Sequence, residues 1–175
     1  MFERSAEAIA YIRNNGVEMI DVKFCNLFGG WHHITMPAAR VNERLLEEGE
    51  GFDGASVPGF KKLERGDMLL VPDLRTAFLD PFCKTRTLSF IGSAVNTEGR
   101  TPYHRDPRGV LQRAEAYLRS RGWATRSVWG PELEFYVFDS AQYENNVNAA
   151  WCSVDSDEAA PDARSGKLAS AARSR

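Results

Sequence analysis

Hydrophobic residues recur at helical spacing in two stretches of the first fifty residues. Residues 5–14 place Ile9 and Ile12 on one face, which predicts a helix with Ser5 as its N-cap. A second apolar stripe follows Pro37 and continues to about residue 49, where a glycine is suited to end a helix. The pattern therefore predicts two helices in this part of the chain.

Other apolar runs have the length and composition of strands. They predict strands at residues 19–24, 31–36, 68–71, 77–79 and 88–91. The first two flank Phe28-Gly29-Gly30 and predict a β-hairpin. Residues 51–59 are rich in Gly and Pro and predict a structured loop, while Pro72-Asp73 and Asp80-Pro81 predict turns between strands. Irregular alternation of helices and strands indicates an α+β fold.

The second half of the chain begins with a clear helix signal. Asp106 precedes Pro107, and apolar residues continue at helical spacing until Gly122. Residues 127–139 predict a strand in a different sheet, so a domain boundary near residue 103 is expected. From Pro161 onward the chain consists mainly of Ala, Ser and Arg, which predicts a disordered tail.

Composition narrows the class of protein. Hydrophobic residues make up 43% and charged residues 26%, as in soluble globular proteins, and a net charge of −2 with interspersed basic residues argues against nucleic acid or anionic membranes as partners. No run approaches the ~20 apolar residues of a membrane span, and the first residues lack the apolar core of a signal peptide. Three widely spaced cysteines argue against a disulfide framework or a zinc site. We expect a cytoplasmic protein.

Two carboxylates are candidates for metal binding. Glu132 and Glu134 are two residues apart on the predicted strand, so their side chains point to the same face with α-carbons ~6.6 Å apart. Carboxylate oxygens suit Mg²⁺, which often sits between carboxylates and substrate phosphates. The same pattern also occurs on the solvent-exposed face of ordinary strands, and the spacing leaves both interpretations open.

Asp53 is the candidate in the glycine-rich loop. Gly54 allows a sharp turn that would present the Asp53 carboxylate to a ligand, whereas the structural alternative is an Asx-turn closed on its own backbone. His32 and His33 are adjacent on a strand and face opposite sides, so they cannot bind one metal together. We therefore predict that one of them is a surface residue and the other a core residue.

Several motifs occur in a characteristic order across residues 17–160. They are the hairpin Phe24–Pro37, the loop Gly51–Ser56, Gly66-Asp67-Met68, Val71-Pro72-Asp73, Asp80-Pro81-Phe82, Arg105-Asp106-Pro107-Arg108 and Gly130–Asp139. In these motifs the chain resembles bacterial type I glutamine synthetases. The resemblance implies a β-grasp domain at residues 4–102 and the first helix and strand of the catalytic domain within residues 103–160. The low-complexity composition predicts the tail at 161–175.

The resemblance also implies a reaction. Members of this family are glutamate–ammonia ligases, which use ATP to form γ-glutamyl phosphate and let ammonia displace the phosphate. By resemblance, Glu132 helps hold a nucleotide-side cation and Glu134 a cation nearer glutamate, Mg²⁺ or Mn²⁺ in each case. The resemblance also implies that Asp53 helps bind ammonium and take its proton, and that Ser56 is a weaker candidate in the same loop. In the family this loop reaches a neighbouring subunit's active site in a ring-shaped homo-oligomer, typically a dodecamer, and the resemblance implies the same assembly here.

The chain departs from the family pattern in two ways. Ala55 precedes Ser56 where the family usually has a pair such as Ser-Ser, which is a mild change. The family's remaining metal ligands, nucleotide-binding elements and substrate-binding arginines would lie beyond residue 175. After Ala160 we would expect Trp-Asn, but Pro161 begins the tail, and a reading-frame shift near codon 161 is the simplest interpretation. We therefore expect an N-terminal fragment that is inactive alone.

Two other functions remain open. A relative within the family could join glutamate to another amine, such as a polyamine, although Asp53 favours ammonium. Alternatively, the chain could be a non-catalytic β-grasp fragment that docks onto other subunits.

Overall fold

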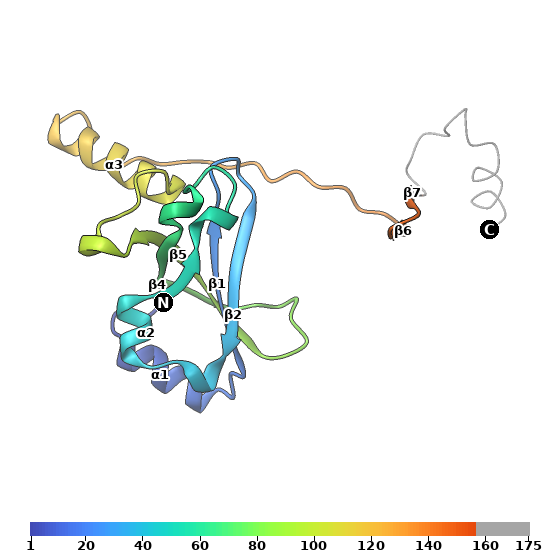
Figure 1. The fold of residues 1–175 in the computed structure, drawn as a ribbon, viewed down its shortest axis with the longest axis horizontal. Coiled ribbons are helices and arrows are strands. Elements are labelled where there is room, and N and C mark those ends of the chain that lie inside the picture. Colours follow the sequence, from blue (N-terminus) through green and yellow to red (C-terminus); the bar gives the residue numbers. More distant parts are fainter. Residues whose placement is uncertain (157–175) are drawn as a thin grey trace. The chain divides into compact units, whose positions relative to one another are not determined.

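The computed structural model describes residues 1–156, which divide into a compact unit, Met1–Ser127, and a second unit that begins at Val128. Figure 1 shows the elements of both units. The predicted tail at residues 161–175 lies outside the described residues.

A five-stranded sheet forms the centre of the first unit. Its strands are β1 (Met19–Cys25), β2 (Trp31–Pro37), β3 (Glu50–Asp53), β4 (Asp67–Leu79) and β5 (Thr87–Asn96). The spatial order is β2-β1-β5-β4-β3, with β1 and β5 parallel and the other neighbours antiparallel. The predicted hairpin of β1 and β2 and the α+β class are confirmed.

Two helices lie side by side next to this sheet (Figure 1). The helix α1 (Ser5–Asn14) has the predicted bounds, but Arg4 is its N-cap residue, and the Ser5 hydroxyl instead donates to Glu47 at 2.8 Å. The predicted continuous helix after Pro37 is wrong. The chain forms a 3-10 turn, η1 (Ala38–Arg40), and then the short α2 (Glu43–Glu48).

The break before α2 has a local cause. Asn42 has an extended backbone and its side chain accepts a hydrogen bond of 2.9 Å from the amide of Leu45, which starts a new helix at this point. Gly49 ends α2 with a φ of 89°, a conformation that favours glycine.

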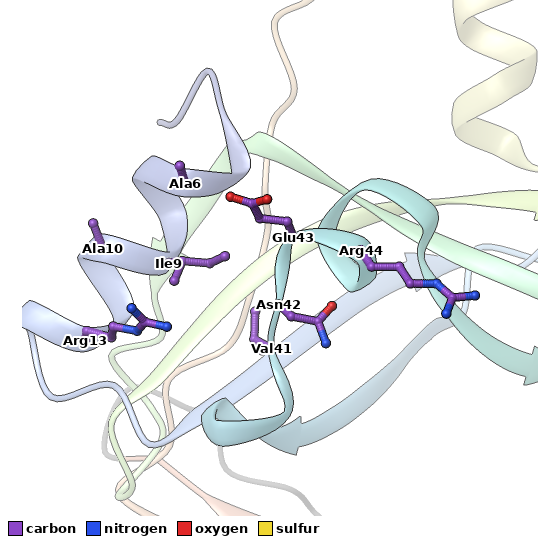
Figure 2. A pocket seen from close by; sticks show the side chains of 8 residues that line it. All are labelled: Ala6, Ile9, Ala10, Arg13, Val41, Asn42, Glu43 and Arg44. Atoms are coloured by element: carbon purple, nitrogen blue, oxygen red, sulfur yellow. The ribbon is translucent and has the colours of Figure 1, made fainter.

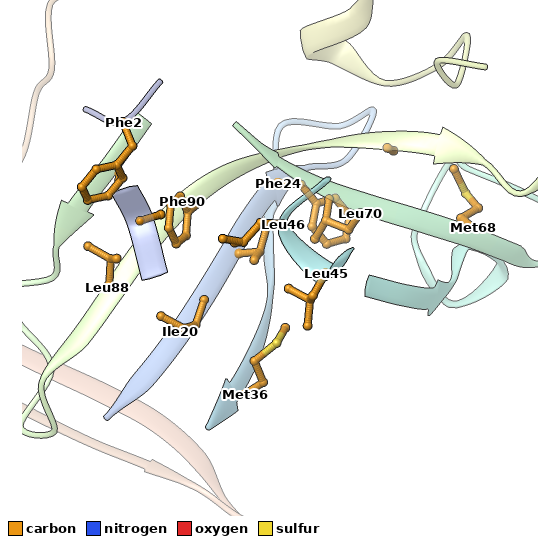
Figure 3. Close-up of a cluster of buried hydrophobic side chains, with 14 of the residues drawn as sticks. Phe2, Ile20, Phe24, Met36, Leu45, Leu46, Met68, Leu70, Leu88 and Phe90 are labelled. Carbon is orange, nitrogen blue, oxygen red and sulfur yellow. The ribbon is translucent and has the colours of Figure 1, made fainter. Parts of the chain in front are cut away.

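The hydrophobic core lies between the sheet and these helices. Ile20, Leu70, Leu88 and Phe90 from the central strands are fully buried, and α2 adds Leu46 (Figure 3). Burying such side chains provides ~1.5–3 kcal/mol each relative to leaving them exposed. The core fixes the positions of β3 and β4, whose ends carry the candidate loop.

The strand β4 is longer than predicted. It continues through Pro72-Asp73, where we had expected a turn, and its pairing with β5 shifts register between Asp73 and Phe78. At this bulge the hydroxyl of Thr76 accepts a hydrogen bond of 2.8 Å from the amide of Ile91. A side chain thus satisfies a backbone group that the bulge leaves without its strand partner.

The helix α3 (Pro107–Ser120) confirms the strongest helix prediction. Asp106 is its N-cap and accepts a hydrogen bond of 3.2 Å from the amide of Arg108. The remaining short turns of the first unit are η2 (Gly54–Ser56), η3 (Leu63–Arg65) and η4 (Glu98–Arg100). Among residues 1–156, no helix has both the length and the hydrophobicity needed to cross a membrane.

The second unit contains a hairpin of β6 (Ser140–Asn145) and β7 (Ala150–Asp155), which the sequence analysis missed. The predicted strand over residues 127–139 is wrong for the described part of the chain, because residues 131–138 pair with no other described strand. A strand needs a hydrogen-bonding neighbour. Tyr136 and Phe138 nevertheless stack with ring centroids 6.1 Å apart, as expected for an extended segment with alternating side chains.

Candidate functional site

Asp53 lies at the junction of a strand and a tight turn. It is the last residue of β3, opposite Asp67 of β4, and it is also the N-cap of η2. The predicted loop over residues 51–59 is therefore wrong at its start, because Gly51 and Phe52 belong to β3. The loop begins at Asp53, where the strand ends. The side chain of Asp53 is exposed, as predicted.

The Asp53 carboxylate is held by its own turn. One oxygen accepts a hydrogen bond of 2.8 Å from the Ala55 amide, and the other accepts one of 2.6 Å from the Ser56 hydroxyl. The Ser56 hydroxyl, followed by the Ala55 amide, lowers the pKa of Asp53 below its ordinary value. The Asx-turn that was the structural alternative is thus present, and its two donors favour the ionised form of Asp53.

Glycines shape this loop. The Gly54 amide donates a hydrogen bond of 2.7 Å to the Gly66 carbonyl, and a Cβ at Gly54 would overlap the buried side chain of Met68. Gly59 has a φ of 82° and leaves room for Leu27, at the tip of the hairpin, to approach within 2.9 Å of where its Cβ would be. The loop conformation therefore depends on glycine at both positions.

Sequence analysis missed the residues that hold the far side of this loop. The Tyr103 hydroxyl donates a hydrogen bond of 2.7 Å to the Phe60 carbonyl, and the Arg105 guanidinium donates one of 3.3 Å to the Gly59 carbonyl. Both donors lie more than forty residues after the loop along the chain. No local pattern signals this contact, although a tyrosine near the start of a helix could have been marked as a packing residue.

Glu132 and Glu134 lie in the second unit, and both are exposed in a segment without strand pairing. Their carboxylates are donors of the type that Mg²⁺ prefers. However, within residues 1–156 no three His, Cys, Asp or Glu side chains gather into a possible metal site. The donor chemistry fits a magnesium ion, but the described residues supply too few ligands for one.

The two adjacent histidines face opposite sides of β2, as predicted. His32 stacks on the buried Phe24 with ring centroids 5.4 Å apart, whereas His33 lies 2.7 Å from a carboxylate oxygen of Asp21. Because these environments differ, the pair cannot hold one metal ion.

A groove of about 560 Å³ runs between α1 and α2 (Figure 2). Ala6, Ile9 and Ala10 form one side of it, and Val41 lies on the other. It contains none of the candidate residues. The candidate chemistry in the first unit is therefore at the exposed Asp53 turn and not in this groove.

Two family models match the chain. "Glutamine synthetase, beta-Grasp domain" matches residues 16–97, and "Glutamine synthetase, catalytic domain" matches residues 104–174. The interval between the two matches includes residue 103, near which we expected a domain boundary. The second match extends past Pro161, the point at which we expected the resemblance to break.

Individual relatives agree with these matches. A glutamine synthetase of Frankia alni is 42% identical over 163 residues, which cover 91% of this chain and 34% of the relative. A protein of Cupriavidus pinatubonensis named 3-hydroxylaminophenol mutase is 36% identical over 159 residues, covering 91% of this chain and 34% of that protein. The chain spans about a third of the length of the curated relatives it matches.

A solved structure supports the fold. The cryoEM structure of Plasmodium falciparum glutamine synthetase aligns with a TM-score of 0.68 and 21% identity, covering 90% of this chain and 30% of that one. The arrangement of the five-stranded sheet and its helices is therefore that of an N-terminal β-grasp domain in this class of enzyme.

Proposed function

The chain belongs to the glutamine synthetase family, and on that premise we propose that it forms part of an ATP-dependent glutamate–ammonia ligase. The reaction phosphorylates the γ-carboxylate of glutamate, and ammonia then displaces phosphate from γ-glutamyl phosphate to give glutamine. The observation that supports this proposal best is the exposed Asp53 carboxylate, which Ser56 and Ala55 hold in a fixed turn by hydrogen bonds to both of its oxygens.

Asp53 can bind ammonium without giving up its turn. A carboxylate has about four lone-pair positions. Each Asp53 oxygen accepts one of these two hydrogen bonds within the turn, so each retains acceptor capacity for an N–H of a cation. Charge-assisted bonds of this type are roughly twice as strong as neutral ones. We propose that Asp53 attracts and orients ammonium at this turn.

Proton removal makes a further demand on Asp53. Its lowered pKa makes the carboxylate a weak base while Ser56 and Ala55 remain bonded to it. Transfer of a proton from ammonium to Asp53 would release ammonia, whose lone pair can attack the γ-carbonyl carbon as phosphate leaves. Weakening the Ser56 bond would favour this step by raising the basicity of Asp53. In this proposal Ser56 therefore sets the balance between cation binding and proton removal.

Glu132 and Glu134 would each contribute a carboxylate to a Mg²⁺ or Mn²⁺ ion, which offsets negative charge on the transferring phosphoryl group. Both side chains are exposed and accessible for this role. The other ligands would come from residues outside those described. ATP and glutamate are the proposed co-substrates, and the proposed assembly is a cytoplasmic homo-oligomer, a dodecamer as the family resemblance implies.

The amine is the part of the proposal that most needs a test, since a protein with another name shares 36% identity with this chain. Residues 1–156 can be joined to the remaining catalytic domain of the Frankia alni relative, with that relative's own full-length enzyme as the control. We expect ATP-dependent glutamine formation and phosphate release with ammonium, and no product with the polyamine putrescine.

Two results would contradict the proposed function. One is an assembled chimera that binds ATP but forms product only with putrescine. The other is an assembled, ATP-binding chimera that forms no product with either amine while the control enzyme is active, which would favour the docking-fragment alternative.

A further inference from the structure

We propose that Tyr103 is a positioning residue that holds the Asp53 loop, residues 53–61, in the conformation that presents Asp53. The functional importance of this inference rests on the role proposed for Asp53. The contacts on which it stands do not depend on that role and can be tested separately.

The Tyr103 side chain is packed directly against the loop. It is only 3% exposed, its hydroxyl donates to the Phe60 carbonyl at 2.7 Å, and its ring centroid lies 5.1 Å from that of Phe60. The ammonium group of Lys61 lies 5.8 Å from the centroid of the same ring. Burial raises the pKa of Tyr103.

A short series of hydrogen bonds leads from Phe60 back to Asp53. The Phe60 amide donates to the Val57 carbonyl at 3.1 Å, and the Val57 and Lys61 amides donate to the Gly54 carbonyl at 3.3 and 3.2 Å. These bonds close the segment that carries the two donors to Asp53, the Ala55 amide and the Ser56 hydroxyl. Release of the Phe60 carbonyl would therefore loosen the closed segment.

Tyr103 is itself anchored on the sheet. Its amide donates to the Ala94 carbonyl of β5 at 2.9 Å, and its carbonyl accepts from the Asp106 amide at 3.2 Å. Asp106 is 3% exposed and accepts a hydrogen bond of 3.2 Å from the Ala94 amide. The connection between β5 and α3 is thus rigidly attached and can serve as a fixed support for the loop.

The test compares Tyr103→Phe with Tyr117→Phe in the 175-residue chain. Tyr103→Phe keeps the ring and removes only the hydroxyl, whereas Tyr117 is 51% exposed on α3 and donates no hydroxyl hydrogen bond among the described residues. Amide exchange over residues 54–61 and the carboxyl ¹³C titration of Asp53 are measured by NMR. Exchange of the core amides in β1 and β5 reports on global stability.

We expect Tyr103→Phe to speed exchange of the loop amides by about tenfold, the effect of one typical lost hydrogen bond. The pKa of Asp53 should rise toward its ordinary 3.8 as Ser56 and Ala55 separate from it. Tyr117→Phe should change neither. Unchanged loop exchange and an unchanged Asp53 titration would overturn the proposal, as would acceleration that is equal in β1, β5 and the loop.

The ligase proposal can fail without affecting this result. If Asp53→Asn leaves ammonium use unchanged in an active chimera, the ammonium role of Asp53 is lost. The Tyr103 effect on the Asp53 titration would then still establish a positioning contact.

Discussion

The hydroxyl of Ser56 donates a hydrogen bond of 2.6 Å to the carboxylate of Asp53, three residues before it. This bond closes a local turn and also stabilises the negative charge that a cation would meet. The structural and functional interpretations of Asp53 are therefore compatible. A turn that preorganises an exposed carboxylate reduces the cost of ordering it when a ligand binds.

Ser56→Ala should raise the pKa of Asp53 toward 3.8, because the largest cause of its lowering is removed. The carboxylate should remain ionised at neutral pH, since the change stays within the acidic range. Carboxyl ¹³C titration of the 175-residue chain measures this directly. Ser120→Ala, which removes a hydroxyl on α3 far along the chain from the loop, is the matched control. An Asp53 titration curve identical in both variants and the parent would rule out this role for Ser56.

Asp106→Asn should alter how stability depends on pH. Burial raises the pKa of Asp106 above 3.8, so its contribution to stability is fully present below 3.8 and is lost as pH rises through the folded-state pKa. The asparagine side chain does not ionise, so the variant does not lose stability in this way as pH rises. It keeps an acceptor oxygen for the helix cap. The free energy of unfolding of the parent should therefore fall relative to that of the variant as pH rises from about 3.5 to 7. Urea denaturation at a series of pH values measures this difference, and a constant difference would contradict the assignment.

Glu132→Ala and Glu134→Ala should each lower ligase activity of the chimera by about a hundredfold or more, because each removes a proposed metal ligand. Both residues are exposed, so the fold should be preserved. Gln142→Ala, an exposed substitution on β6, is the control. Parent-level turnover by either glutamate variant across a magnesium titration would exclude that residue as a ligand.

The 175-residue chain alone should form no glutamine. Phosphoryl transfer depends almost entirely on alignment and electrostatic stabilisation, and residues 1–156 assemble no cluster of three metal-binding side chains. The assay supplies glutamate, ammonium, ATP and magnesium or manganese. Glutamine above a no-protein control, lost in Asp53→Ala, would show that the short chain is active.

Local sequence signals predicted several elements well. Asp106-Pro107 marked the start of α3, and the glycines after Phe28 marked the hairpin, because capping and turn chemistry act over a few residues. Other features depend on distant partners. Pro72-Asp73 continues β4 because β5 pairs on both sides of the bulge and Thr76 bonds to Ile91, fifteen residues away.

The candidate site likewise combines features that local sequence predicts with features that depend on distant residues. The glycine-rich segment around Asp53 indicated a turn, and the structure brings Asp53 and Ser56 together there. The support from Tyr103 could not be predicted, because it joins residues 43 positions apart without a local pattern. Glu132 and Glu134 have strand-like spacing, but pairing requires a neighbouring strand that the described residues do not supply.

The most direct test of the ammonium role is the steady-state kinetics of Asp53→Asn in the chimera with the Frankia alni catalytic domain. The substitution keeps the size of the side chain and one acceptor oxygen but removes the charge that attracts a cation. We predict that KM for ammonium rises by about a hundredfold, as expected for loss of a charge-assisted contact, while KM for glutamate changes by less than about twofold. A variant with the parent's KM for ammonium and the parent's kcat would contradict the account.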